Sequence, residues 1–222
     1  MNETAASRMR SAYKHLRMLT VIIGSLYFVC LGGGVVTSHV MPEKLRTAIA
    51  KQEAQSAQGV ESVFGRFREP VRQGRWGAIA ACSGLVFLLN LSGDFIHFTV
   101  LSILILPAFF TIGVGGWLQG ISLAGVHASS GLSLILFLLM GALEWTTYVL
   151  ATVAGVNIGL SVLMPKRQAA TTRWRAFRRA SGEAGWVYLM IIGILAVQAV
   201  VEMLYVRKVL LMGGSGVPLM PY

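Results

Sequence analysis

One apolar stretch, residues 131–163, constrains the fold of this chain more than any other feature. It reads GLSLILFLLMGALEWTTYVLATVAGVNIGLSVL, which is longer than the about 20 apolar residues that a helix needs to cross a bilayer. Its only acidic or basic residue, Glu144, lies near the middle, where a charged side chain costs about 3 kcal/mol on insertion scales. We therefore expect Glu144 to face protein or water rather than lipid.

Small residues follow Glu144 at helical spacing. Ala151, Gly155 and Gly159 recur every fourth residue, so they share one face of a helix. Glu144 lies seven residues before Ala151 and belongs to the same face. The pattern predicts a packing face with one polar group in it. We expect Glu144 to act first as a hydrogen-bonding anchor between helices.

The composition assigns the whole chain to the same class. Of its 222 residues, 55% are hydrophobic and 13% are charged, against about 25% charged in soluble domains. Further apolar runs cover 18–37, 76–91, 98–126 and 186–206. We predict an all-α polytopic membrane protein with about five transmembrane helices. The net charge of +10 does not indicate nucleic-acid binding, because the basic residues flank the apolar runs.

The polar segments predict the topology. Residues 1–17 and 164–185 are basic and are expected in the cytoplasm, because positive charge stays inside. Residues 38–75 are expected to form an amphipathic helix outside the cytoplasm. The tail 207–222 is also expected outside, and the turn around Asp94 is expected inside. In the loop 164–185, basic side chains interleaved with aromatic residues are expected to contact anionic lipid headgroups: Lys166, Arg167, Arg173, Arg175, Arg178 and Arg179.

The predicted membrane core spans 76–163 and contains helix-breaking and close-packing signals. Pro107 predicts a kink or break in the run 98–126, because proline removes a backbone hydrogen bond. Gly116 and Gly120 have the spacing that lets two helices approach closely. These glycines serve contacts within one chain or, alternatively, a homo-oligomer. A proline followed by glycines is also typical of discontinuous transporter helices.

Nothing in the sequence has the spacing of a catalytic or metal site. The histidines lie outside the spans, and Asp94 with His97 lacks a third partner. Cys30 and Cys82 fall inside apolar runs and have no metal-ligand spacing. We therefore expect a protein that is not an enzyme and that has no cofactor and no metal.

Three short elements together resemble the stage II sporulation protein M family of prokaryotic integral membrane proteins. They are Asn90 at the end of FLLN, the segment from Gly115 to Gly120, and the segment from Leu139 to Glu144 before a small-residue helix. The matching positions are Asn90, Gly116, Gly120, Gly141, Glu144 and Gly155. Gly115, Leu139 and Met140 stand where the family has Asn, Pro and His. Metal binding or proton relay by a His–Glu pair is therefore not expected.

The resemblance implies a function through partners. It implies a scaffold in the prokaryotic inner membrane that works with other membrane or envelope proteins, and it does not assign sporulation to this chain. The alternative is a transporter or permease-like subunit that uses Glu144 and the region from Pro107 to Gly120. A hydrated cavity around Glu144 favours transport, whereas a hydrogen bond to protein favours the scaffold.

Overall fold

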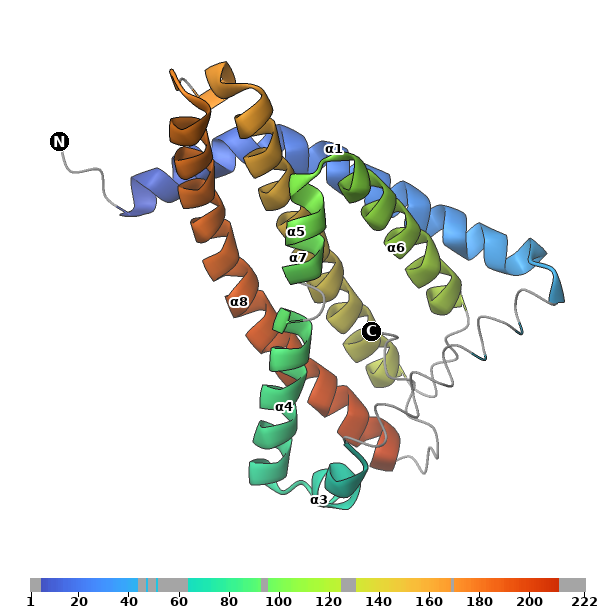
Figure 1. Cartoon of the computed structure of the whole chain (residues 1–222). Coiled ribbons are helices and arrows are strands. Elements are labelled where there is room, and N and C mark those ends of the chain that lie inside the picture. The colour runs from blue at the N-terminus through green and yellow to red at the C-terminus, as the bar shows by residue number, and fades with distance from the viewer. Residues whose placement is uncertain are drawn as a thin grey trace.

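Every element of the chain that the structure describes is helical (Figure 1). The computed structural model describes residues 5–43, 47, 51, 64–92, 96–124, 131–168 and 170–211. The helices are, in order, α1 (Ala5–Val40), η1 (Gly65–Phe67), α3 (Arg68–Arg72), α4 (Trp76–Asn90), α5 (Ile96–Ile103), α6 (Leu106–Ala124), α7 (Gly131–Leu163), η3 (Pro165–Gln168) and α8 (Arg173–Leu211). Within the predicted amphipathic helix at 38–75, residues 44–46, 48–50 and 52–63 lie outside the described residues.

Among the residues that the structure describes, four helices are long and apolar enough to cross a membrane. They are Leu16–Val40, Leu106–Ala124, Leu134–Leu163 and Arg173–Leu211. The all-α membrane character expected from the composition is therefore confirmed. The stretch 131–163 forms one continuous helix, because Gly141 in its middle does not interrupt α7.

Helix α7 lies at the centre of the bundle, and its contacts give the directions of its neighbours. Asn157 contacts Glu183, whereas Phe137, nearer the start of α7, contacts Tyr205, nearer the end of α8. Helix α8 therefore runs antiparallel to α7. Helix α5 runs parallel to α7, because its first residues meet Tyr148 and its last residues meet Gly159.

Helix α4 runs in the same direction as α5. Its start lies at Gly74 against Arg207, near the end of α8, and its apolar face packs back along α8 as far as Ala199 (Figure 1). The chain direction is thus the same before residue 92 and after residue 96. The predicted turn around Asp94 lies outside the described residues, and the two helices on either side of it run in the same direction.

The chain reverses instead between α5 and α6, at Leu104 and Ile105 (Figure 1). The predicted single span 98–126 is therefore two helices. The break that Pro107 predicted is present, and the proline occupies the first turn of α6, where a missing N–H costs little. Ile105 has φ of 60°, which ends the preceding helix.

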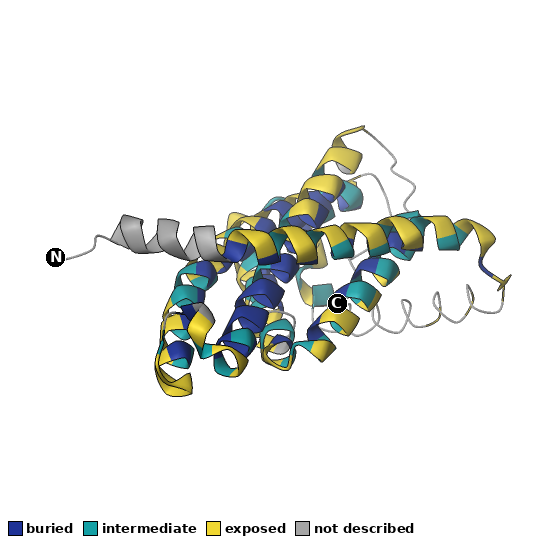
Figure 2. Cartoon of the chain, turned by 90° about the horizontal axis from the view of Figure 1, so that it is seen from above, coloured by how far each residue is buried: buried dark blue, intermediate teal, exposed yellow. Residues whose placement is uncertain are grey.

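The largest core lies where α1, α5, α6 and α8 surround α7 (Figure 2). Residues 151–159 of α7 are all buried, as expected for a helix in contact with others on every side. Two smaller clusters join α4 to α8 and the first half of α7 to the end of α8. The outer faces expose large apolar side chains, which suits contact with lipid.

Helix α8 begins earlier than its apolar part. The predicted basic loop 164–185 contains the first turns of this helix, since α8 starts at Arg173. One face of these turns is fully buried, and it is lined by Ala176, Ala180 and Ala184. The connection between α7 and α8 is therefore reduced to the short segment that carries η3.

Candidate functional site

Glu144 is buried, with 3% of its surface exposed, and its carboxylate accepts hydrogen bonds from protein. Gln119 on α6 donates from Nε2 to Glu144 Oε1 at 3.2 Å. The Tyr148 hydroxyl donates to the same oxygen from the next turn of α7. The Tyr27 hydroxyl on α1 donates to Gln119 Oε1. We call Tyr27, Gln119, Glu144 and Tyr148 the Glu144 network.

The local packing explains why these four side chains meet. Gly116 lies one turn before Gln119, and a Cβ on it would lie 2.8 Å from the Tyr27 carbonyl oxygen. Only glycine lets α6 come this close to Tyr27. On the other side, the Phe98 ring stacks on the Tyr148 ring with centroids 4.6 Å apart. Helices α1, α5 and α6 thus position the partners of a carboxylate on α7.

The network links three helices through a chain of donors and acceptors. Gln119 uses its amide oxygen toward α1 and its amide nitrogen toward α7. Such buried polar chains stabilise one relative arrangement of helices, since any slip leaves a donor or acceptor unpaired. These hydrogen bonds can therefore align the three helices.

The glycines singled out from the sequence lie at two close helix contacts. Gly120 faces α1, and a Cβ on it would lie 2.0 Å from the Leu31 carbonyl oxygen. Gly155 and Gly159 face α5, where added Cβ atoms would lie 2.6 Å from the Thr99 carbonyl oxygen and 2.2 Å from the Ile103 carbonyl oxygen. Both pairs of glycines therefore serve contacts within the chain.

The remaining motif residues lie apart from the Glu144 network. Asn90 is buried at the end of α4, and among the described residues its Oδ1 has no hydrogen-bond partner. Ala151 and Gly141 are buried on α7. Met140, where the resembling family has His, is buried in an apolar cluster with Phe137 and Tyr205.

Pro107 is far from Glu144. It lies 12 residues before Gln119 on the same helix, which is about 18 Å at the helical rise of 1.5 Å per residue. The break beside it lies at Ile105, which contacts Gly159 near the end of α7. The structure therefore brings the Gln119 end of the region from Pro107 to Gly120 to Glu144, whereas the break itself lies near the end of α7.

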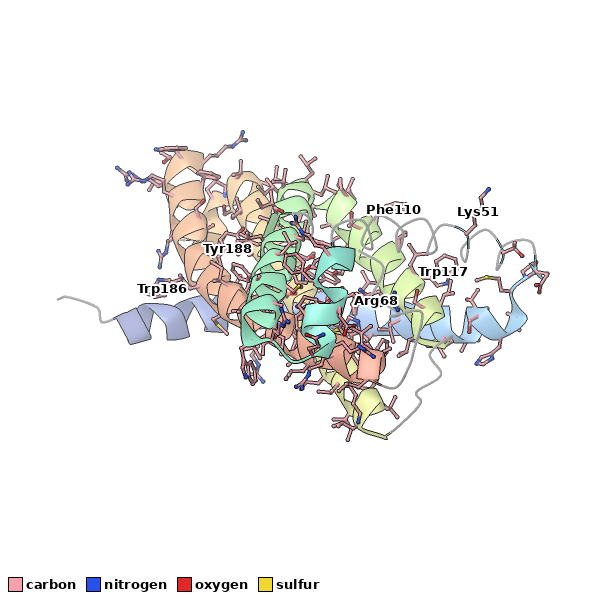
Figure 3. All side chains as sticks on the ribbon, turned by 90° about the horizontal axis from the view of Figure 1, so that it is seen from below. Lys51, Arg68, Phe110, Trp117, Trp186 and Tyr188 are labelled. Carbon is pink, nitrogen blue, oxygen red and sulfur yellow. The ribbon has the colours of Figure 1, made fainter. Side chains whose placement is uncertain are left out.

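The basic residues that were predicted to contact lipid headgroups lie together at one end of the molecule, and a second basic group lies near α3 and the end of α8: Arg66, Arg68, Arg72, Arg75, Arg207 and Lys208. Lys166, Arg173, Arg175, Arg178 and Arg179 are exposed; the Arg167 side chain is outside the described part. Trp174 is also exposed and stacks on Phe177 with ring centroids 5.5 Å apart. Trp186 and Tyr188 mark the start of the apolar part of α8 (Figure 3).

A second polar cluster, which the sequence did not reveal, lies at this basic end. Glu183 on α8 accepts hydrogen bonds from Asn157 Nδ2 and Gln168 Nε2, each at 3.3 Å. Arg179 donates to the Gln168 carbonyl oxygen at 3.2 Å. The sequence signal that could have indicated this cluster is Asn157, the single amide within the apolar run 131–163. The cluster ties η3 to α7 and α8.

No group of three or more His, Cys, Asp or Glu that suits a metal ion occurs among the described residues. Asp94 and the His97 side chain are outside that part. In comparisons with known proteins, the family model described as stage II sporulation protein M matches residues 18–205. No curated protein and no solved structure gives a significant match.

Proposed function

Because the chain belongs to the stage II sporulation protein M family, we propose that it is a non-enzymatic scaffold or assembly subunit of the prokaryotic cell membrane. It works by holding partner proteins at the envelope. The observation that carries the proposal is that Gln119 and Tyr148 both donate hydrogen bonds to the Glu144 carboxylate. A buried acid that accepts hydrogen bonds from its own helix and from a neighbouring one supports a structural role more than a transport site.

The proposed topology has five crossings with the N-terminus in the cytoplasm. Helix α4 has 15 residues, about 22 Å of helix, and is shorter than the hydrocarbon core of about 30 Å. We propose that α4 and α5 together form one discontinuous crossing. The basic N-terminus and the basic end of α8 then lie on the same side, where anionic lipid headgroups attract them.

Partner capture tests the scaffold role. A tagged full-length chain is expressed at native level, crosslinked in intact membranes, extracted in mild detergent, and its bound proteins are identified by mass spectrometry. We expect a reproducible set of membrane or envelope proteins. Isolation of the chain alone, with neither a partner nor self-association, would overturn the proposal.

Two glycine variants provide a matched control. Gly120→Leu places a side chain into the contact with Leu31, whereas Gly32 has open space around its Cβ position, so that Gly32→Leu is tolerated. A specific partner set is retained by Gly32→Leu and lost by Gly120→Leu. Equal capture by both variants would indicate that the captured proteins do not recognise the folded bundle.

A further inference from the structure

Helices α1 and α6 form a pair whose backbones touch directly. Added Cβ atoms on Gly34 and Gly120 would each lie 2.0 Å from a carbonyl oxygen of the opposite helix. A hydrogen bond of 3.2 Å from Trp117 Nε1 to Thr37 Oγ1 closes the far end of this contact (Figure 3). With backbone against backbone along this contact, the α1–α6 pair cannot slide internally without a clash.

Helices α5, α7 and α8 form a second group, in which α5 and α7 are in equally close contact. Gly155 and Gly159 bring α7 against the α5 backbone, as described above. Asn157 and Glu183 join α7 to α8 by a hydrogen bond. Helix α4 packs on the second half of α8 and therefore belongs to the same α5–α7–α8 group.

The contacts between the pair and the group are made by side chains rather than by backbone. A Cβ on Gly24 of α1 would lie 3.8 Å from Val149 Cγ1, which is an ordinary van der Waals distance. The Phe28 and Trp145 rings meet edge to face with centroids 6.3 Å apart. Apolar side chains such as Leu16 and Ile23 complete the interface. Such contacts permit small sliding movements, since they have no fixed direction.

A directed contact also crosses this interface. Gln119 on the pair donates to Glu144 on the group, and Tyr27 fixes the Gln119 side chain from within the pair. A buried hydrogen bond to a charged group contributes more than a neutral one, and its loss leaves buried groups unpaired. The Gln119–Glu144 bond therefore distinguishes this arrangement from any shifted one.

The chain connects the two bodies through a strained residue. Ile105 lies between α5 of the group and α6 of the pair, and it is the only described residue other than glycine with positive φ. A β-branched residue rarely adopts this conformation, which persists where the surroundings enforce it and recurs at switch regions. Its backbone would relax if the two bodies moved.

We infer that the α1–α6 pair turns as one body about Ile105 relative to the α5–α7–α8 group, and that the Gln119–Glu144 hydrogen bond is the latch that holds the arrangement described above. The inference goes beyond the proposed function and does not rest on it. Opening the latch would expose the Glu144 carboxylate and the face of α7 next to α6.

Distances between spin labels test the latch in the full-length protein in lipid nanodiscs. Cys30 and Cys82 are first replaced by Ala. One label pair, at Val36 on α1 and Leu138 on α7, reports across the interface, and a second pair, at Val36 and Leu118 on α6, reports within the α1–α6 pair. All three labelled positions are exposed. Pulsed electron paramagnetic resonance then measures the distance distribution of each label pair.

Gln119→Leu removes the latch and Thr37→Val removes a hydrogen bond inside the pair only. We expect Gln119→Leu to add a longer Val36–Leu138 distance while the Val36–Leu118 distance is unchanged, and Thr37→Val to alter neither. An unchanged Val36–Leu138 distance, or equal broadening of both pairs, would overturn the inference. If Gln119→Leu does not fold, Ile105→Gly, which frees the connection, decides by the same two criteria.

Discussion

Gly34 and Gly120 face each other where α1 crosses α6, and a Cβ built on either glycine would lie 3.0 Å from the Cα of the other. The two helices are therefore separated by hydrogen atoms alone at this point. In a bilayer, such close approach replaces the hydrophobic driving force, because lipid is as apolar as the helix surface. The fold of the α1–α6 pair depends on the absence of two side chains.

The first prediction concerns this contact. Gly120→Ala forces α1 and α6 apart and should destabilise the protein by about 1–3 kcal/mol, as overpacking of a close-packed interior does. Gly32→Ala is the matched control on α1, because its Cβ would meet no atom within 4 Å. Thermal unfolding in one detergent measures both. Equal melting temperatures for the two variants would contradict the close contact.

The second prediction concerns the buried acid. Glu144→Leu leaves Gln119 Nε2 and the Tyr148 hydroxyl without their acceptor, which should cost about 1–3 kcal/mol. Glu144→Gln keeps an acceptor oxygen and should cost less. Thr146→Val is the control, since this exposed hydroxyl bonds only to its own helix at Ala142. Unfolding by denaturing detergent measures the order, and a Leu variant as stable as the Gln variant would contradict it.

Helices α1 and α7 could be predicted because a bilayer leaves few alternatives. An apolar run as long as 131–163 must be a helix, since every backbone polar group needs a partner inside lipid. The spacing of Gly116 and Gly120 likewise predicted a close helix contact. It did not predict the partner, because α1 contributes only Gly34 of its three consecutive glycines, and Gly32 and Gly33 face open space.

The partners of Glu144 were beyond sequence reasoning for a different reason. Gln119 is an amide in an apolar run with no partner that the sequence identifies. Tyr27 and Tyr148 carry no signal either, because tyrosine in an apolar run is typical of the membrane interface. Their meeting depends on the relative rotation of α1, α6 and α7. That rotation follows from the glycine contacts, which only the tertiary structure reveals.

The third prediction concerns the basic end. Asn157→Leu removes one of the two amides that bind Glu183, so η3 loses part of its attachment to α7 and α8. Backbone amides of residues 166–168 should then exchange hydrogen faster, because local opening becomes easier. Ser161→Ala is the control, since Ser161 bonds only to Ile158 of its own helix. Exchange by mass spectrometry checks the difference, and equal rates would contradict it.

The last prediction separates the two possible positions of the chain reversal. Ser92 follows α4 and Leu104 follows α5, and both side chains are exposed. If α4 and α5 form one crossing, Leu104 lies at the membrane surface on the N-terminal side, whereas Ser92 lies within the bilayer. Leu104→Cys should therefore react with a membrane-impermeant maleimide from that side, and Ser92→Cys should react from neither side.

The background for these variants carries Ala at Cys30 and Cys82. As a control, Lys51→Cys, exposed beyond the end of α1, should react from the opposite side only. Labelling of Ser92→Cys as fast as Leu104→Cys would restore the turn at residues 92–94, because a surface turn leaves a thiol in water where thiolate can form.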